Sequence, residues 1–237
     1  MNDSKHKILL FDADNTLFDF DKAEKIVFAK TFTDAGFACG DDVFARFHRI
    51  NASLWRQIET GEMTRELLKS ERFRRLLVEL NLDTSVAAEL GDAFVANLGQ
   101  CNVLIDGALE ICEELAMTGK FAMFIVTNGI SSVQRGRFYS SPISRFFDGI
   151  FISDDIGISK PSKEYFDHVF ANTGNRDRGE YLIIGDSLTS DIKGGIDSGI
   201  DTCYYNRGAT AGGNNINSRI TYTISDLGEL LGILNTN

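Results

Sequence analysis

Two carboxylates, one residue apart, follow directly after a short apolar run near the start of the chain. The run is Ile8-Leu9-Leu10-Phe11, and Asp12 and Asp14 come at its carboxyl end. An apolar run of this length is typical of a buried strand, and open α/β sheets bind ligands beyond the carboxyl ends of their strands. Carboxylates crowded there repel each other unless a cation joins them or one carries a proton. The pair is a candidate for metal binding and proton transfer, with a solvated acidic turn as the alternative.

A second group of polar residues follows the apolar pair Ile125-Val126. It consists of Thr127-Asn128-Gly129, and a helical pattern comes after it. A hydroxyl, an amide and free backbone N–H groups at the start of a helix can hold phosphate or oxyanion oxygens. The same residues also make good turns, so this stretch alone does not identify a site.

Two later stretches add a cation and more carboxylates. Pro161 favours an extended or turn conformation at Lys160, which can direct the ammonium group toward a site. A solvated surface lysine is the alternative. Asp186 ends the apolar run Ile183-Ile184-Gly185, and Asp191 follows about one turn later, where it would also suit the cap of the next helix.

The carboxyl ends of parallel strands meet at one edge of a sheet, so these side chains are expected to converge there. Clustered carboxylate oxygens suit a hard divalent cation, and Mg²⁺ in particular, which keeps several waters and accepts substrate phosphate oxygens. No set of Cys and His has the spacing of a zinc site.

The elements that must position these residues alternate between strand and helix from Asp106 onward. Strands are expected at Phe121–Val126, Gly149–Ile152, Tyr181–Ile184 and near Thr202–Tyr205, with helices near 109–116, 131–139, 163–173 and 189–197. Gly208–Asn217 is expected to be a loop and Asp226–Leu234 a short helix. This alternation predicts an α/β fold, a Rossmann-like doubly wound parallel sheet.

Between the first two strands the chain is several times longer than the dozen or so residues that a crossover needs. Its pattern is helical: Leu68, Phe73, Leu76, Leu77 and Leu80 recur at helical spacing, as do Val86, Leu90, Phe94 and Leu98 before Gly99. We predict a catalytic core at residues 1–17 and 99–237, with an inserted all-helical cap domain at 18–98.

The amino-acid composition limits the kinds of molecule that this chain is expected to bind. The chain has 237 residues, 43% of them hydrophobic, and a net charge of −10. Such a charge disfavours polymeric nucleic acid and anionic membranes, but a metal ion and one lysine can still attract a small phosphate ester. The four scattered cysteines are expected to be reduced thiols, and the first apolar run is too short for a signal peptide, so a cytoplasmic protein is expected.

The order of these motifs resembles the haloacid dehalogenase (HAD) superfamily of phosphohydrolases. The motifs are Asp12-Ala13-Asp14-Asn15-Thr16, then Thr127-Asn128, Lys160-Pro161, and Gly185-Asp186 with Asp191. The inserted helical segment lies where one subgroup of that superfamily carries its cap, the C1 type. The longer run from Leu10 to Phe20, with Leu54-Trp55 and Gly61, is similar to the pyrimidine 5′-nucleotidases.

The resemblance implies that Asp12 attacks phosphorus and forms an aspartyl-phosphate, while Asp14 protonates the leaving oxygen and then deprotonates water. It also implies that Thr127, the Asn128 backbone and Lys160 hold the phosphoryl oxygens. Mg²⁺ would bind the Asp12 and Asp186 side chains and the Asp14 carbonyl, with Asp191 orienting that group of ligands or a metal-bound water.

Substrate choice is expected to lie in the cap, where Trp55, Phe18 and Phe20 are candidates to contact a base. Core packing is the alternative for both phenylalanines. A nucleoside monophosphate is the expected substrate, and a sugar-phosphate phosphatase or a phosphomutase is the alternative within the superfamily. A phospho-aspartate receiver module uses similar residues, but the long insertion and the Asp12-x-Asp14 spacing argue against it.

Overall fold

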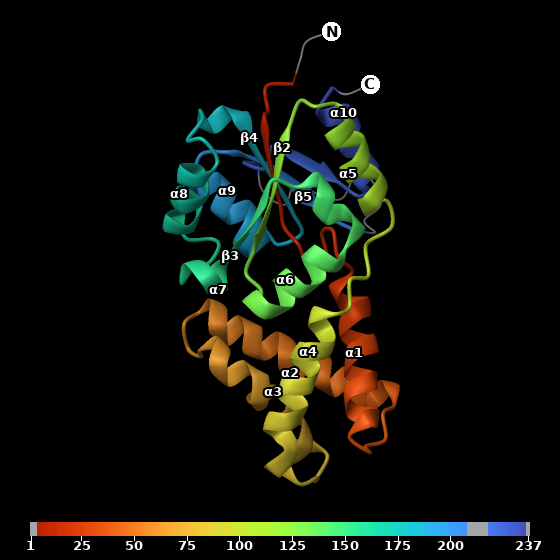
Figure 1. Cartoon of the computed structure of the whole chain (residues 1–237). Coiled ribbons are helices and arrows are strands. Elements are labelled where there is room, and N and C mark those ends of the chain that lie inside the picture. Colours follow the sequence, from red (N-terminus) through yellow and green to blue (C-terminus); the bar gives the residue numbers. More distant parts are fainter. Residues whose placement is uncertain (1–3, 208–217, 236–237) are drawn as a thin grey trace.

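Six parallel strands form one sheet in the computed structural model, which describes residues 4–207 and 218–235 (Figure 1). The strand order is β3-β2-β1-β4-β5-β6, so β1 lies at the centre between β2 and β4. This confirms the predicted α/β fold with a parallel sheet. The strands are β1 (Ile8–Phe11), β2 (Ala122–Thr127), β3 (Gly149–Ile152), β4 (Tyr181–Gly185), β5 (Asp201–Tyr205) and β6 (Tyr222–Ile224).

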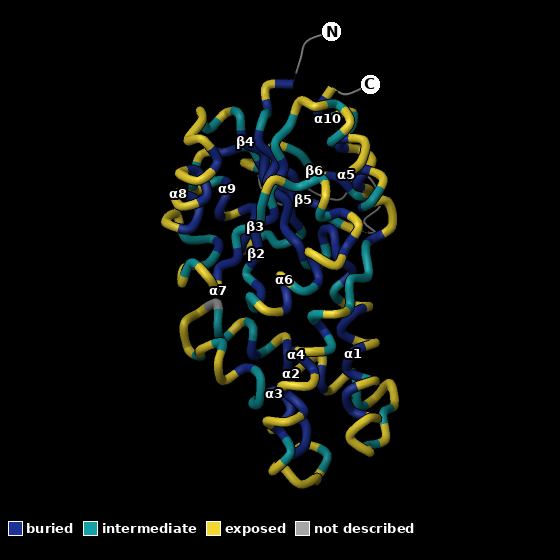
Figure 2. Tube along the Cα trace, viewed as in Figure 1, coloured by how far each residue is buried: buried dark blue, intermediate teal, exposed yellow. Residues whose placement is uncertain are grey.

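Alternate residues of β1 pack on opposite faces of the sheet, as the period of an extended chain requires. Leu9 and Phe11 belong to one apolar cluster, which includes side chains of α5 (Ala108–Met117) and of the C-terminal segment. Ile8 and Leu10 belong to another, which includes side chains of α8 (Lys163–Asn172). All four side chains are buried, so the apolar run reflects a strand covered by helices on both faces (Figure 2).

The helices around the sheet are short. They are α5 (Ala108–Met117), α6 (Ser131–Ser140), α7 (Ser153–Ile156), α8 (Lys163–Asn172), α9 (Lys193–Asp197) and α10 (Leu230–Ile233). Short 3₁₀ turns occur at Thr84–Val86, Pro142–Phe146, Arg178–Glu180 and Leu227–Glu229, and a π-helical turn at Leu188–Ile192. The helix expected at 189–197 is therefore that π turn followed by α9.

Four helices lie between β1 and α5 in the chain and extend beyond the carboxyl end of β1 (Figure 1). They are α1 (Phe20–Asp34), α2 (Asp41–Glu59), α3 (Arg65–Glu79) and α4 (Ala87–Gly99). Their apolar side chains form a cluster of their own around Phe28, Phe47, Phe73 and Phe94. The ring of Phe47 lies 4.4 Å from that of Phe28 and 5.3 Å from that of Phe94, measured between centroids. We refer to α1–α4 as the helical unit.

The helical unit contacts the rest of the molecule, which contains the sheet and is called its sheet side below, mainly through α6. Helices α4 and α6 approach so closely that a Cβ on Gly136 would lie 2.4 Å from the carbonyl oxygen of Gly99. Val133 of α6 packs into the apolar cluster of the helical unit. Helix α6 therefore joins the helical unit to the rest of the molecule.

The strand β6 was not predicted, because three residues give too little alternation to recognise. The loop predicted at Gly208–Asn217 lies outside the described residues. All four cysteines are free thiols, as expected. Among the described residues, no helix is both long and apolar enough to cross a membrane.

Candidate active site

Three carboxylates meet where β1 and β4 end. These strands pair with Phe11 opposite Ile184, and the Asp12 N–H donates to the Ile184 carbonyl at 2.9 Å. Asp12 and Asp186 therefore leave the sheet side by side. Asp191 comes from the π-helical turn, and one carboxylate oxygen from each of the three lies within 4.8 Å of the others.

Lys160 binds two of these carboxylates. Its Nζ donates to Asp12 Oδ1 at 2.6 Å, to Asp191 Oδ1 at 2.7 Å and to the Val126 carbonyl at 2.7 Å. Only 1% of the side chain is exposed, so the surface-lysine alternative is wrong. The Asn128 side chain exchanges two hydrogen bonds of 2.9 Å with the Lys160 backbone, which fixes the lysine relative to β2.

The balance of charge in this cluster is negative. Burial raises the pKa of Asp12 well above its ordinary value, even though Lys160 acts in the opposite direction. Burial and then the Asp191 charge raise the pKa of Asp186 to about 7. Burial acts to lower the pKa of Lys160, but Asp12 and Asp191 outweigh it and the pKa is raised. One ammonium faces three carboxylates, of which Asp12 and Asp191 are buried and Asp186 is half-buried, and this leaves room for a further cation. An all-oxygen donor set fits Mg²⁺.

Asp191 does not cap the helix that follows it. The Ser187 hydroxyl takes that place by accepting from Ser190 N at 3.2 Å. The fully buried Asp191 carboxylate instead accepts from Lys160 Nζ through one oxygen and from Ser187 N, at 3.1 Å, through the other. Gly185 is required beside it, because a Cβ there would lie 2.4 Å from Asp191 Oδ2.

Asp14 is held by two side chains of α6 that the sequence analysis did not single out. Arg137 Nη1 donates to Asp14 Oδ1 at 2.5 Å, and Gln134 Nε2 donates to Asp14 Oδ2 at 2.7 Å. Gly129 leaves room for this contact, since a Cβ there would lie 2.1 Å from Gln134 Nε2. The sequence contained one signal for this contact. A glutamine and an arginine lie three residues apart on the helix that follows the Thr-Asn-Gly motif.

A cavity of about 290 Å³ brings the predicted residues together. Its lining includes all eight residues singled out as site candidates: Asp12, Asp14, Trp55, Thr127, Asn128, Lys160, Asp186 and Asp191. Phe20 also lines it, whereas Phe18 is buried in the core, where its ring lies 4.7 Å from the Arg137 guanidinium. The core-packing alternative therefore holds for Phe18, whereas Phe20 both packs against the apolar cluster of the helical unit and lines the cavity.

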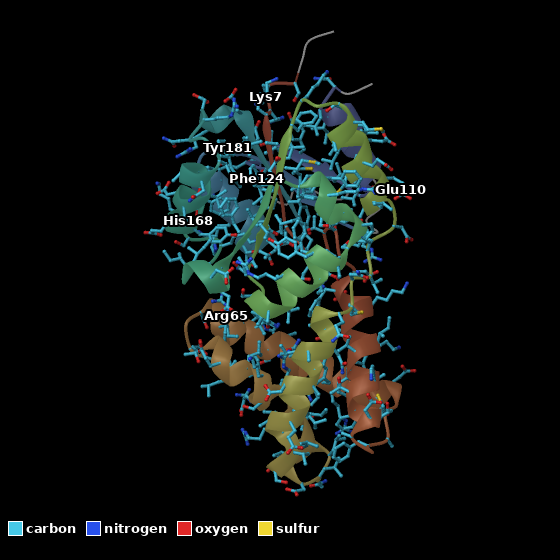
Figure 3. All side chains as sticks on the ribbon, in the orientation of Figure 1. Lys7, Arg65, Glu110, Phe124, His168 and Tyr181 are labelled. Carbon is cyan, nitrogen blue, oxygen red and sulfur yellow. The ribbon has the colours of Figure 1, made fainter. Side chains whose placement is uncertain are left out.

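A second contact between the helical unit and the rest of the chain comes from Arg65, at the start of α3. Its side chain extends toward the sheet side of the molecule in Figure 3, and its Nη2 donates to the Ser153 hydroxyl of α7 at 2.9 Å. Arg65 therefore joins the helical unit to α7. The same unit lines the cavity with Trp55 and Phe20.

Comparison with known proteins gives consistent matches along the chain. A family model described as haloacid dehalogenase-like hydrolase matches residues 6–199. The HAD-hydrolase YfnB from Bacillus subtilis (strain 168) is 40% identical over 232 residues, covering 98% of this chain and 96% of YfnB. A crystal structure of YfnB bound to magnesium, which reveals interdomain movement, has 40% identity and a TM-score of 0.87, and covers 97% of this chain and 99% of that one.

Two further relatives carry the name pyrimidine 5′-nucleotidase. YjjG from Escherichia coli (strain K12) is 31% identical over 226 residues, covering 95% of this chain and 96% of YjjG. PynA from Streptococcus pneumoniae (strain ATCC BAA-255 / R6) is 30% identical over 234 residues, covering 98% of this chain and 96% of PynA.

Proposed function

The chain belongs to the haloacid dehalogenase-like hydrolases, and we propose on that basis that it hydrolyses phosphate monoesters through an aspartyl-phosphate on Asp12, with Mg²⁺ as cofactor. The observation that carries this proposal is the convergence of Asp12, Lys160 and Asp186 in one cavity. A carboxylate accepts a phosphoryl group when cations neutralise the oxygens that it approaches.

The cofactor proposal rests on the excess of carboxylates over cations. The Asp12 and Asp186 side chains and the Asp14 backbone carbonyl would hold Mg²⁺, and the relative YfnB binds magnesium. The ion supplies positive charge that offsets repulsion between the nucleophile and the phosphate. Both oxygens of Asp191 already accept hydrogen bonds within the chain, which suits a positioning role.

We assign the steps at the chain's own residues from the family resemblance, and the places of these residues in the cavity support the assignment. Asp12 Oδ attacks phosphorus, and the bond from phosphorus to the leaving oxygen breaks. Asp14 gives that oxygen a proton, then takes one from the water that attacks the aspartyl-phosphate and releases phosphate. Lys160 and the Thr127 hydroxyl, with the Asn128 backbone, bind the phosphoryl oxygens.

We further propose that the substrate is a pyrimidine nucleoside 5′-monophosphate. The relatives YjjG and PynA are named for that activity. In this chain, the two aromatic side chains lining the cavity, Trp55 and Phe20, are suited to contact a planar base. Residues 18–98 would act as a cap that closes over the substrate and excludes water.

A phosphate-release screen tests the proposal. Nucleoside 5′-monophosphates and hexose phosphates are compared with Mg²⁺ and with excess chelator. We expect turnover only with Mg²⁺, a preference for pyrimidine nucleotides, and no turnover by Asp12→Asn. Full activity in chelator would contradict the metal assignment, and a preference for hexose phosphates would favour the sugar-phosphate alternative.

A further inference from the structure

Two contacts between the helical unit and the sheet side differ in kind. Helices α4 and α6 meet backbone against backbone, since a Cβ on Gly136 would strike the Gly99 carbonyl, and Val133 adds apolar packing. The chain also leaves the helical unit at the end of α4, so the covalent connection and the packed contact lie together. Close packing of this kind resists separation, so the helical unit is held most firmly here.

The contact at α7 is more open. In Figure 1, α7 lies on one side of the molecule and α1, where the chain enters the helical unit, on the other. A cavity of about 470 Å³ lies between α3, α6 and α7, and its lining includes Arg65, Lys69, Ser131 and Asp154. The helical unit and the sheet side are therefore separated by open space beside this contact.

The Arg65 side chain crosses from α3 to α7 (Figure 3), and its Nη2 donates to the Ser153 hydroxyl at 2.9 Å. Ser153 is buried and Arg65 is half-buried, so the bond is partly shielded from water. A hydrogen bond from a charged donor is stronger than one between neutral groups. It can still break and reform, because water that enters beside the half-buried guanidinium can take the place of the hydroxyl.

We propose that Arg65 is a positioning residue, whose hydrogen bond to Ser153 is a clasp that holds the helical unit closed over the catalytic cavity. The clasp opens when the unit moves about the α4–α6 contact. Arg65 acts through Trp55, which lines the catalytic cavity from the helical unit. The proposal rests on the proposed role of residues 18–98 as a cap and adds to it the residues that hold the closed state.

Trp55 gives a readout that needs no substrate, because it is the one tryptophan in the chain and it lines the cavity. Quenching of its fluorescence by acrylamide, with Mg²⁺ present, measures how far the cavity is open. In Arg65→Met the quenching constant is expected to rise, and kcat/KM for p-nitrophenyl phosphate to fall about 3- to 10-fold, because loss of the bond shifts the equilibrium toward the open state. Arg65→Lys should recover part of both.

A quenching constant in Arg65→Met equal to that of wild type would overturn the clasp. A higher quenching constant with unchanged kcat/KM would overturn the positioning role. The control Arg74→Met removes an exposed arginine of the same helix, paired with Glu71, and should behave as wild type in both measurements.

Removing the acceptor should have the same consequence as removing the donor. Ser153→Ala is expected to match Arg65→Met, and the double variant to be no worse than either single one, because all of them lack the same bond. Additive losses would overturn the proposal, since they would mean that the two residues act separately. Circular dichroism checks that each variant folds, and if Arg65→Met does not, Arg65→Lys and Ser153→Ala decide.

The two measurements separate this inference from the function on which it rests. If quenching rises in Arg65→Met but wild-type enzyme releases no phosphate from p-nitrophenyl phosphate or from nucleotides, the clasp stands and the proposed function fails. If wild-type enzyme releases phosphate and quenching does not change, only the clasp fails.

Discussion

Replacing Lys160 by methionine tests whether the carboxylate cluster depends on this single buried ammonium. The substitution keeps the length of the side chain and removes one donor that serves three acceptors: Asp12, Asp191 and the Val126 carbonyl. Removing one partner of a buried ion pair costs about 3–5 kcal/mol, because the other charge stays buried and uncompensated. A domain of ordinary stability has about 5–15 kcal/mol in total, so the loss should be large.

The pH dependence of that loss can be worked out from the signs of the pKa shifts. The folded pKa of Lys160 is raised above its ordinary 10.5, so its own contribution is present across neutral pH and is lost only at higher pH. Asp12 already has a raised pKa, and without the lysine its charged form is less favourable still. The deficit of Lys160→Met should therefore be smaller at pH 5 than at pH 8, because Asp12 can take up a proton.

Urea unfolding in excess chelator, followed by circular dichroism, measures this free energy. The control is Lys163→Met, which removes a lysine that is 64% exposed and paired with Asp167 one turn away. Such exposed pairs contribute about 0.3–0.5 kcal/mol, so the control should unfold close to wild type. If Lys160→Met lost less than about 1 kcal/mol relative to the control, the reasoning about the buried cluster would be wrong.

Three other substitutions give distinct outcomes. Gly185→Ala should reduce kcat by about 10-fold or more, because its Cβ would displace the Asp191 carboxylate, and activity assays with Mg²⁺ in excess would show this. In chelator, the melting temperature of wild type should fall as pH rises from about 4 toward 7, because the folded pKa of Asp186 is raised and this carboxyl favours the folded state only while protonated. Asp186→Asn should make that fall less steep. An equal slope in both proteins would contradict the role given to Asp186. Arg137→Met frees Asp14 and should lower kcat at least about 10-fold more for an alkyl phosphate than for p-nitrophenyl phosphate, whose leaving group needs no proton; equal losses would mean that Arg137 does not position the acid.

The sequence was most informative where local pattern and chemistry coincide. Asp12 and Asp186 could be placed together because each ends an apolar strand, and parallel strands present their carboxyl ends at one edge. Their pairing in register puts them side by side. The inserted helices were also predictable, because their apolar residues recur at helical spacing.

Contacts made only by the folded chain could not be predicted. Gln134 reaches Asp14 across 120 residues of sequence, and Arg137 across 123. Periodicity places such residues on a helix but does not identify what they touch. Arg72 looked like one charge among many on α3, yet only 2% of it is exposed. The burial of a long cation depends on packing against residues such as Phe94, which no local pattern reports.

The central claim is that Asp12 takes the phosphoryl group, and trapping that intermediate tests it most directly. Enzyme quenched in acid during turnover with Mg²⁺ is digested, and its peptides are analysed by mass spectrometry for a phosphorylated carboxyl. The account predicts one modified peptide, containing Asp12, which is absent in Asp12→Asn and in excess chelator. Turnover with the phosphate on another residue, or continued turnover by Asp12→Asn, would contradict it.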